Sequence, residues 1–335
     1  MYQKTITERE AGQRFDKYLR KLLPEAGSGF IYKMLRKKNI VLNHKKADGS
    51  EKTVCGDVVE LYFAEETLLK FMGKSQTAPP ETIKPFSVSD RKSLSGIAVL
   101  YENEHILLAD KPVGVLTQKA VKEDVSLNEW LVDYLLESRQ ITPEELHTFR
   151  PSACNRLDRN TSGIVLCAKT VTGAQMLSEA LKTRSLHKFY RLYVKGSLEK
   201  EQLIEGFLLK DENSNKVRIF TDKKDDASYI CTKYMPIRRE RDKTLLEVEL
   251  ITGKPHQIRA HLASMGHPLI GDFKYGEEKS NRRVKREFGL QHQLLHACRI
   301  VFPEIAPGVG AILSRRTFTA PEPELFLSIK ASLEL

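Results

Sequence analysis

The feature that most constrains the fold is the irregular order of the apolar segments after Ile97. Short β-branched runs, typical of strands, occupy residues 99–101, 105–109, 164–166, 190–194 and 245–251. Helical patterns interrupt them at residues 127–136, 173–181 and 256–263. A doubly wound sheet would need strand and helix to alternate regularly, and they do not. The pattern therefore predicts an α+β domain with a mixed, mainly antiparallel sheet.

Residues 12–63 have a different pattern, with two short helices followed by short strands. Phe15, Tyr18 and Leu19 recur at helical spacing, and a second helix after Ser28 has an apolar face that includes Ile31 and Leu35. The residues on the rest of that helix are cations, namely Lys33, Arg36, Lys37 and Lys38. A small α/β module with a cationic helix face is predicted.

Residues 64–96 are polar, contain Pro79-Pro80, and have no clear periodicity, so we expect an interdomain linker. The second domain then spans residues 97–330. A length of 335 residues is sufficient for two domains.

The net charge is +10, which favours a polyanionic partner, although basic surfaces also serve solubility. No apolar run approaches the roughly 20 residues of a membrane span, and the N-terminus lacks the apolar stretch of a secretory signal. We therefore expect a cytoplasmic protein without a membrane partner. The five cysteines are scattered, which disfavours a disulfide framework or a thiolate zinc site.

The segment around Asp158 is the most informative for chemistry. Arg156 and Arg159 flank this carboxylate, and a turn of small residues ending at Gly163 leads into an apolar strand. Nearby positive charge favours the ionised form of a carboxylate. A surface aspartate in an ordinary salt bridge is the alternative explanation.

A second segment, residues 250–263, is predicted to be a strand, a tight turn and a helix. Ile258 shares a helix face with Leu262, and the neighbouring Arg259 could reach an acid. The histidines His256, His261 and His267 do not have the spacing of a zinc protease and lack a companion Cys or Glu. We expect no metal there, and bonds from these histidines to backbone or phosphate.

A third segment places Lys188, Tyr190 and Leu192 on one face of a strand. A basic and an aromatic side chain together suit base stacking, but strand tyrosines also serve as packing residues. Asp110-Lys111-Pro112 is by default a turn that follows a strand.

Together these segments resemble the RluA-like family of pseudouridine synthases, in particular its bacterial members that act on large-subunit ribosomal RNA. The resemblance covers about residues 97–302. It rests on Asp110-Lys111-Pro112 with Gly114, Arg156-Leu157-Asp158 with Thr161-Ser162-Gly163, Lys188 with Tyr190, and Gly253 with His256-Gln257-Ile258-Arg259 and His261-Leu262. The family usually has Arg-Thr where this chain has Lys254-Pro255.

The N-terminal segment resembles the small RNA-binding module named after ribosomal protein S-four. The similarity rests on Arg14 and Asp16 before the first helix, the basic helix at residues 31–38, Asn43, and Gly56-Asp57.

The resemblance implies an isomerase that breaks the bond between uracil N1 and the ribose, rotates the base and rejoins it through C5. Asp158 would attack the ribose or remove its 2′ proton, and both routes stay open. Arg259 would pair with Asp158, Tyr190 would stack on the uracil, and Ile258 would line the pocket. Arg156 would fill the space left by the extruded base. Further substrate contacts are expected from Lys188, His256 and Gln257.

Phosphate contacts are expected from the cationic helix face and from a second basic cluster that contains Arg282 and Arg283, for which a solvated loop is the alternative. No glycine-rich phosphate loop is present, so no nucleotide or other cofactor is expected, and a fused methyltransferase is disfavoured. The expected partner is RNA and the expected state is a monomer. A non-catalytic RNA-binding or ribosome-assembly factor is the competing hypothesis.

Overall fold

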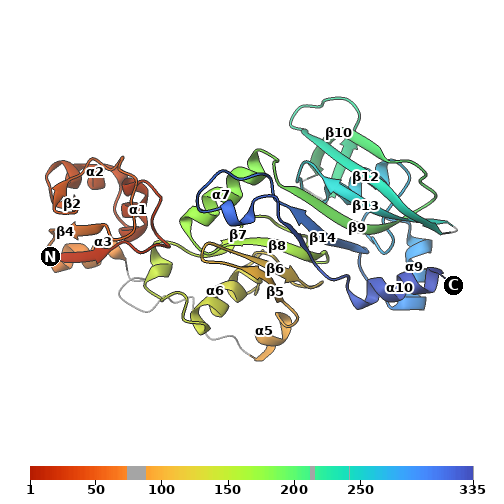
Figure 1. Cartoon of the computed structure of the whole chain (residues 1–335), viewed down its shortest axis with the longest axis horizontal. Helices are drawn as coiled ribbons and strands as arrows, with labels where there is room; N and C mark the ends of the chain where they lie inside the picture. Colours follow the sequence, from red (N-terminus) through yellow and green to blue (C-terminus); the bar gives the residue numbers. More distant parts are fainter. Residues whose placement is uncertain (74–87, 212–215, 241, 335) are drawn as a thin grey trace.

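The chain forms a small N-terminal module and a larger domain built on one long sheet (Figure 1). A computed structural model describes residues 1–73, 88–211, 216–240 and 242–334. None of the helices within these ranges is long and apolar enough to cross a membrane.

The N-terminal module is a four-stranded antiparallel sheet covered by helices. Its elements are β1 (Tyr2–Thr5), α1 (Phe15–Leu22), α2 (Ser28–Arg36), β2 (Ile40–Leu42), β3 (Lys45–Lys46), β4 (Val58–Leu61) and α3 (Glu65–Met72). The strand order is β1-β4-β2-β3. The apolar faces predicted for the two helices form the core, where Phe15, Tyr18 and Ile31 are buried. Strand β1 lies outside the predicted limits of 12–63, because its place in the sheet depends on pairing with the distant β4.

The segment expected to be a linker begins with a helix, which corrects the interpretation of its first residues. In α3, Leu68 and Phe71 pack on the core of the module, and the Phe71 ring lies 4.2 Å from the Phe30 ring. The helix is short and amphipathic, so its periodicity was too weak to separate it from the polar segment. A second helix, α5 (Val88–Ser93), precedes the large domain. Residues 74–87, which include Pro79-Pro80, lie outside the described residues.

The large domain has an eleven-stranded sheet, which confirms the predicted fold class. Its strands are β5 (Ala98–Glu102), β6 (Ile106–Lys111), β7 (Ser152–Ala153), β8 (Ser162–Ala168), β9 (His187–Lys195), β10 (Gln202–Asp211), β11 (Lys216–Phe220), β12 (Ser228–Glu240), β13 (Lys243–Leu250), β14 (Leu295–Val301) and β15 (Thr317–Thr319). The main order is β11-β10-β12-β13-β9-β14-β8-β6-β5. Among the described strands only β8 and β14 pair in parallel.

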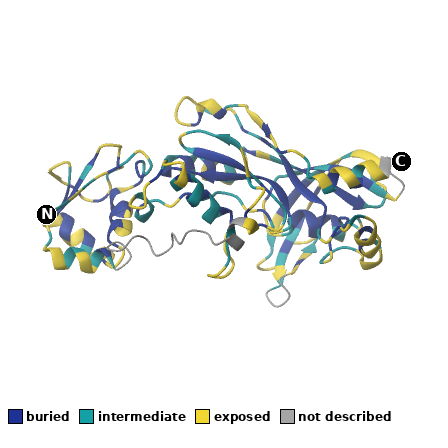
Figure 2. Ribbon diagram, turned by 90° about the horizontal axis from the view of Figure 1, so that it is seen from below, coloured by how far each residue is buried: buried dark blue, intermediate teal, exposed yellow. Residues whose placement is uncertain are grey.

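The central strands are buried on both faces, so they are apolar at successive positions (Figure 2). In β6, Leu107 and Ala109 join one core, while Ile106 and Leu108 join the opposite core. The larger core includes residues of α6 (Leu127–Glu137) and α8 (Gln257–Ser264), and the opposite core includes residues of α7 (Val171–Lys182). The remaining helices are α9 (Glu278–Phe288), α10 (Glu324–Glu334), and the short 3-10 helices η1 (Glu145–His147) and η2 (Ala311–Leu313).

The module contacts the large domain through the turn that follows β1. The backbone N–H of Val171 donates to the Arg9 carbonyl at 2.9 Å, and the Gln175 amide donates to the Gly12 carbonyl at 2.8 Å. The fully buried Glu10 carboxylate accepts a hydrogen bond from the Thr148 hydroxyl and pairs with Lys4 at 2.9 Å. These contacts join the two parts at a point far in sequence from residues 64–96.

Candidate active site

Asp158 lies in the loop between β7 and β8 and remains reachable from solvent. Its side chain is 28 % exposed. The preceding residue, Leu157, is buried, and its backbone N–H and carbonyl are both hydrogen-bonded to the Thr117 hydroxyl. The Asp158 carbonyl accepts from the Thr161 N–H at 3.0 Å. The loop therefore holds the carboxylate in a defined position while leaving it accessible.

Arg259 connects Asp158 to a second, fully buried carboxylate. From α8, its Nη1 donates to Asp158 at 2.8 Å, while Nε and Nη2 donate to Asp272 at 2.7 and 3.0 Å. Arg259 is 7 % exposed; burial opposes its charge, but Asp272 and Asp158 outweigh burial and raise the pKa of the guanidinium. Burial likewise opposes the charge of Asp272, but Arg259 outweighs it and lowers the pKa of this carboxyl. The predicted contact between Arg259 and Asp158 is present, and Asp272 holds the arginine in place.

Asp272 was not identified from the sequence. Asp272 lies 13 residues after Arg259 and beyond the end of α8. No local spacing relates the two residues. An aspartate after a glycine is ordinary in a turn, so the pattern alone pointed to a loop.

Lys111 belongs to the Asp110-Lys111-Pro112 motif, but the sequence assigned no separate role to its amine. It is fully buried at the end of β6, and its Nζ donates to the carbonyls of Pro112, Val115 and Arg159 at 3.0, 2.8 and 3.2 Å. Burial lowers the pKa of Lys111 to about 7, against the charges of Asp158 and Asp110. The amine thus ties the loop after β6 to the loop that contains Asp158.

Tyr190 and Ile258 form an apolar wall with Leu157. All three residues are buried in the same core, on β9, α8 and the Asp158 loop respectively. Burial, with a smaller effect of the Asp158 charge, raises the pKa of Tyr190, so its phenol stays neutral. A flat, uncharged ring could lie against such a wall.

His256 precedes α8 in a left-handed conformation, with φ 55°. Its Nδ1 is 2.8 Å from the Tyr275 hydroxyl, which also accepts from the Val217 N–H at 3.0 Å. Burial lowers the pKa of His256; the Asp158 charge acts in the opposite sense, and Arg259 reinforces the lowering. The imidazole is therefore neutral at pH 7 and belongs to the surroundings of Asp158.

Residues 105–264 match the family model described as RNA pseudouridylate synthase. A protein from Vibrio vulnificus called ribosomal large subunit pseudouridine synthase C is 30% identical over 298 residues, covering 89% of this chain and 87% of that one. The chain belongs to the RNA pseudouridylate synthase family. A protein of the same name from Vibrio cholerae is 29% identical over 303 residues, with coverage of 89% and 87%.

One solved structure agrees with this family fold. The human RNA pseudouridylate synthase domain containing 4 aligns with a TM-score of 0.56 at 19% identity, covering 74% of this chain and 96% of that chain. The predicted resemblance to RluA-like pseudouridine synthases is therefore confirmed, and the chain is an isomerase that acts on RNA uridine.

In this synthase Gln257 does not have the position expected of a substrate contact. It is buried, and its amide donates to the Cys231 carbonyl and the Thr232 hydroxyl, both at 3.0 Å. Its oxygen accepts from the Thr252 hydroxyl and the Lys254 N–H at 2.9 and 3.1 Å. Because this side chain points into the protein and its hydrogen-bonding capacity is used, it shapes the turn before α8 instead.

Lys188 and Arg156 keep charged groups available beside the site. Arg156 is exposed and has no hydrogen bond or ion pair with another described residue. Lys188 is partly exposed, and a Cβ added to Gly253 would lie 3.7 Å from its Nζ. Burial, followed by the charge of Arg184, lowers the pKa of Lys188. The glycine therefore leaves open space next to an amine.

The two predicted RNA-binding clusters differ in the synthase. The cations of the first, Lys33, Arg36, Lys37 and Lys38, are exposed, and no ion pair joins them to another described residue. The second cluster lies on α9 and is not a loop, which corrects that alternative. There Arg282 pairs with Glu278 at 2.5 Å and Arg283 with Glu287 at 2.8 Å, each four residues apart.

The three histidines considered for a metal have protein partners. His261 Nδ1 is 3.1 Å from the Thr232 hydroxyl, and His267 Nδ1 is 3.0 Å from the Lys195 carbonyl. Within the described ranges no three or more His, Cys, Asp or Glu residues are grouped so as to hold a metal ion.

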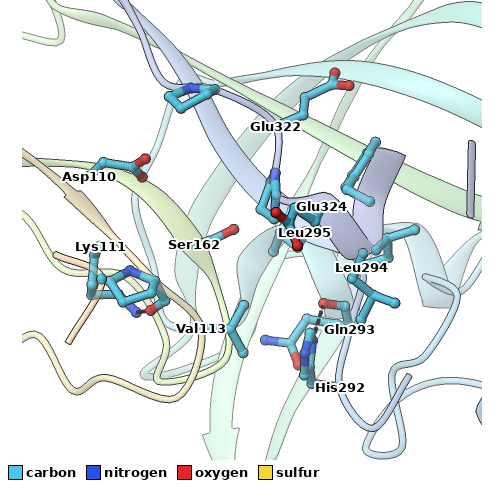
Figure 3. Close-up of a pocket in the computed structure, with 16 residues that line it drawn as sticks. Asp110, Lys111, Val113, Ser162, His292, Gln293, Leu294, Leu295, Glu322 and Glu324 are labelled. Carbon is cyan, nitrogen blue, oxygen red and sulfur yellow. Dashed lines mark hydrogen bonds between the residues drawn. The ribbon is translucent and has the colours of Figure 1, made fainter. Parts of the chain in front are cut away.

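A cavity of about 470 Å³ is lined by residues that follow β6 and by residues 292–295 and 321–326 (Figure 3). Its lining includes Asp110, Lys111 and Gln293 but not Asp158, and Gln293 donates to the Thr161 hydroxyl at 3.3 Å. Burial raises the pKa of Asp110 to about 6. The cavity is thus separate from the Asp158 carboxylate, although both adjoin the loops around Lys111 and Thr161.

Proposed function

We propose that this synthase isomerises specific uridines of large-subunit ribosomal RNA, with Asp158 as its one catalytic carboxylate. The observation that carries the proposal is a partly exposed aspartate hydrogen-bonded at 2.8 Å to a buried arginine, which a second carboxylate anchors. The relatives named ribosomal large subunit pseudouridine synthase C, from two Vibrio species, support the choice of RNA. We also propose that the protein acts as a cytoplasmic monomer.

The proposed reaction needs one ionised carboxylate and no external oxidant or water. Asp158 either attacks the ribose C1′ as the bond to uracil N1 breaks, or removes the 2′ proton to give a glycal. The base rotates and C5 bonds to C1′; in the first route this breaks the bond between Asp158 and C1′, and in the second Asp158 returns the proton to C2′. C5 then loses its proton as N1 gains one. Arg259 donates a hydrogen bond to Asp158 and fixes the orientation of its carboxylate.

The neighbouring residues receive roles that match their positions. The uracil ring would stack on Tyr190 beside Ile258, where a neutral phenol and an apolar side chain avoid the cost of burying charge. His256 would donate a hydrogen bond near Asp158 in place of the Tyr275 contact. Arg156 would occupy the gap in the RNA stack, which offsets part of the few kcal/mol that extrusion of a base costs.

RNA backbone contacts would come from two places. Lys188 lies beside the open space at Gly253 and would meet a phosphate next to the target nucleotide. The N-terminal module would act as an RNA-binding domain of the S-four type, with its exposed cations on α2. Its domain limits would extend from β1 to α3.

The test is the Asp158→Asn variant, assayed on unmodified large-subunit ribosomal RNA transcribed from the genome that encodes this chain. Pseudouridine formation should fall by about 10⁴-fold or more, as loss of an essential catalytic group does. RNA affinity should change by less than about threefold, since one partly exposed carboxylate is replaced by its isostere.

Asp225→Asn, which changes an exposed aspartate in the turn before β12, is the matched control and should retain full activity. Turnover by the Asp158 variant would refute the assigned role. RNA binding by the unaltered protein without any pseudouridine would instead support the non-catalytic assembly factor.

A further inference from the structure

Phe273 is a large apolar side chain held at the surface beside the active site. It is 49 % exposed. It directly follows Asp272, whose carboxylate binds Arg259, which in turn binds Asp158. The inference drawn from this position rests on the proposed function.

The loop around Phe273 is rigidly braced. The Asp272 carboxylate accepts from the backbone N–H groups of Lys274 and Tyr275 at 2.9 and 3.1 Å. Asn281 closes the loop, because its side chain accepts from the Gly271 N–H at 2.8 Å and donates to the Asp272 carbonyl at 2.9 Å. Since Asp272 is fully buried, the loop leaves the next side chain, Phe273, at the surface in a preset position.

The residue that follows Phe273 is a cation, and other cationic side chains act on it. Lys274 is near enough to Arg259 and Asp158 for their charges to shift its pKa, which burial mainly lowers. The charge of Lys216, on the edge strand β11, also lowers the pKa of Lys274. The Tyr275 hydroxyl accepts a hydrogen bond from the N–H of Val217 on the same strand. Lys254, on the turn before α8, is exposed. Positive charge around an exposed aromatic ring is the combination that binds unpaired nucleotides.

We propose that Phe273 stacks on a nucleobase of the RNA next to the extruded uridine. Extrusion leaves the neighbouring bases without one stacking partner, and an aromatic side chain replaces that partner for any base sequence. Single exposed apolar residues are common on proteins, and Ile312 is one, 62 % exposed on η2. Phe273 differs from Ile312 because it directly follows Asp272, which is linked to Asp158 through Arg259.

The experiment compares Phe273→Ala, Phe273→Leu and Phe273→Trp on one RNA fragment that contains a mapped target uridine. Loss of the ring in the Ala and Leu variants should lower kcat/KM about tenfold, which is within the effect of one base–aromatic stack. The Trp variant should stay within about threefold of the unaltered enzyme. Ile312→Ala is the control and should leave kcat/KM unchanged.

A second measurement detects the stack itself. 2-Aminopurine placed on either side of the target uridine should lose fluorescence on binding to the unaltered enzyme and to the Trp variant. The quenching should be weaker with the Ala and Leu variants at saturating protein. Asp158→Asn should quench as the unaltered enzyme does, because it lacks turnover but keeps the ring.

The outcomes separate the two proposals. If Phe273→Ala has full kcat/KM and full quenching while Asp158→Asn is inactive, the stacking role is wrong and the proposed function stands. If the unaltered protein makes no pseudouridine, both are wrong. Equal thermal midpoints of the Leu and Trp variants would show that a difference in their activity comes from the ring and not from unfolding.

Discussion

The charges around Asp158 and the charges on α2 are arranged in opposite ways. Arg259 is almost fully buried, and its Nε, Nη1 and Nη2 each donate to a named carboxylate oxygen. Four exposed cations, Lys33 and Arg36 on α2 and Lys37 and Lys38 directly after it, form no ion pair with other described residues. Buried charges are costly to unpair and hold one geometry, whereas exposed charges are mobile and screened by salt. We therefore expect mutations in the first set to change stability and turnover, and mutations in the second to change affinity.

The largest effect is expected from Asp272→Asn. The asparagine side chain is neutral, and only its oxygen can accept a hydrogen bond. Arg259 therefore loses its buried anionic partner. Breaking a buried pair typically costs about 3–5 kcal/mol of unfolding free energy. Urea denaturation should show that loss, and pseudouridine formation should fall because Arg259 no longer holds Asp158. A stability equal to that of the unaltered protein would show that Asp272 does not anchor the site.

The pH dependence of the same pair sharpens this prediction. The folded-state pKa of Asp272 is lowered below the value of about 3.9 that an unfolded chain has. The carboxylate therefore contributes its full stability above about pH 4, and loses it as the pH falls from there towards the folded-state pKa. The stability difference between the unaltered protein and Asp272→Asn should be constant from pH 6 to 7 and should shrink below about pH 4. A constant difference down to pH 3 would contradict this.

An intermediate effect is expected when the α2 cations are replaced. The variant with Gln at Lys33, Arg36, Lys37 and Lys38 should bind large-subunit ribosomal RNA about 10- to 100-fold more weakly at low salt. The slope of log K against log salt should also be smaller, because fewer counterions are released. At saturating RNA, kcat should be unchanged. If kcat falls while the salt dependence stays the same, α2 is not a phosphate-binding surface.

The smallest effect is expected on α9. Arg282 and Arg283 already pair with Glu278 and Glu287, so their charges are partly neutralised before RNA arrives. The double Gln variant should weaken RNA binding by about threefold or less at the same salt concentration. If each charge removed from α9 weakened RNA binding as much as each charge removed from α2, paired and unpaired surface cations would not differ.

Much of this contrast was present in the sequence. The apolar spacing of Phe15, Tyr18 and Leu19, and that of Ile31 and Leu35, predicted two helices with one cationic face, and the structure has α1 and α2 there. The basic helix expected to reach residue 38 ends at Arg36. Glu278 and Arg282 are four residues apart, as are Arg283 and Glu287, so the pairs on α9 could have been predicted once a helix was expected. The sequence did not predict α9, because its arginines were interpreted as a basic cluster without regard to their four-residue spacing from the glutamates.

The sequence by itself determined several of the strands and helices, the mainly antiparallel class of the sheet, and the motifs that relate Asp158, Tyr190 and Arg259 to one family. Only the tertiary structure decided which carboxylate anchors Arg259, that Gln257 points inward, and that β1 completes a sheet with β4. Helix and strand patterns come from interactions between residues that are near in sequence, so the spacing of apolar residues reveals them. The partner of a buried charge is decided by which distant segments pack together, and neither Asp272 nor Gln257 carries a local pattern that shows it.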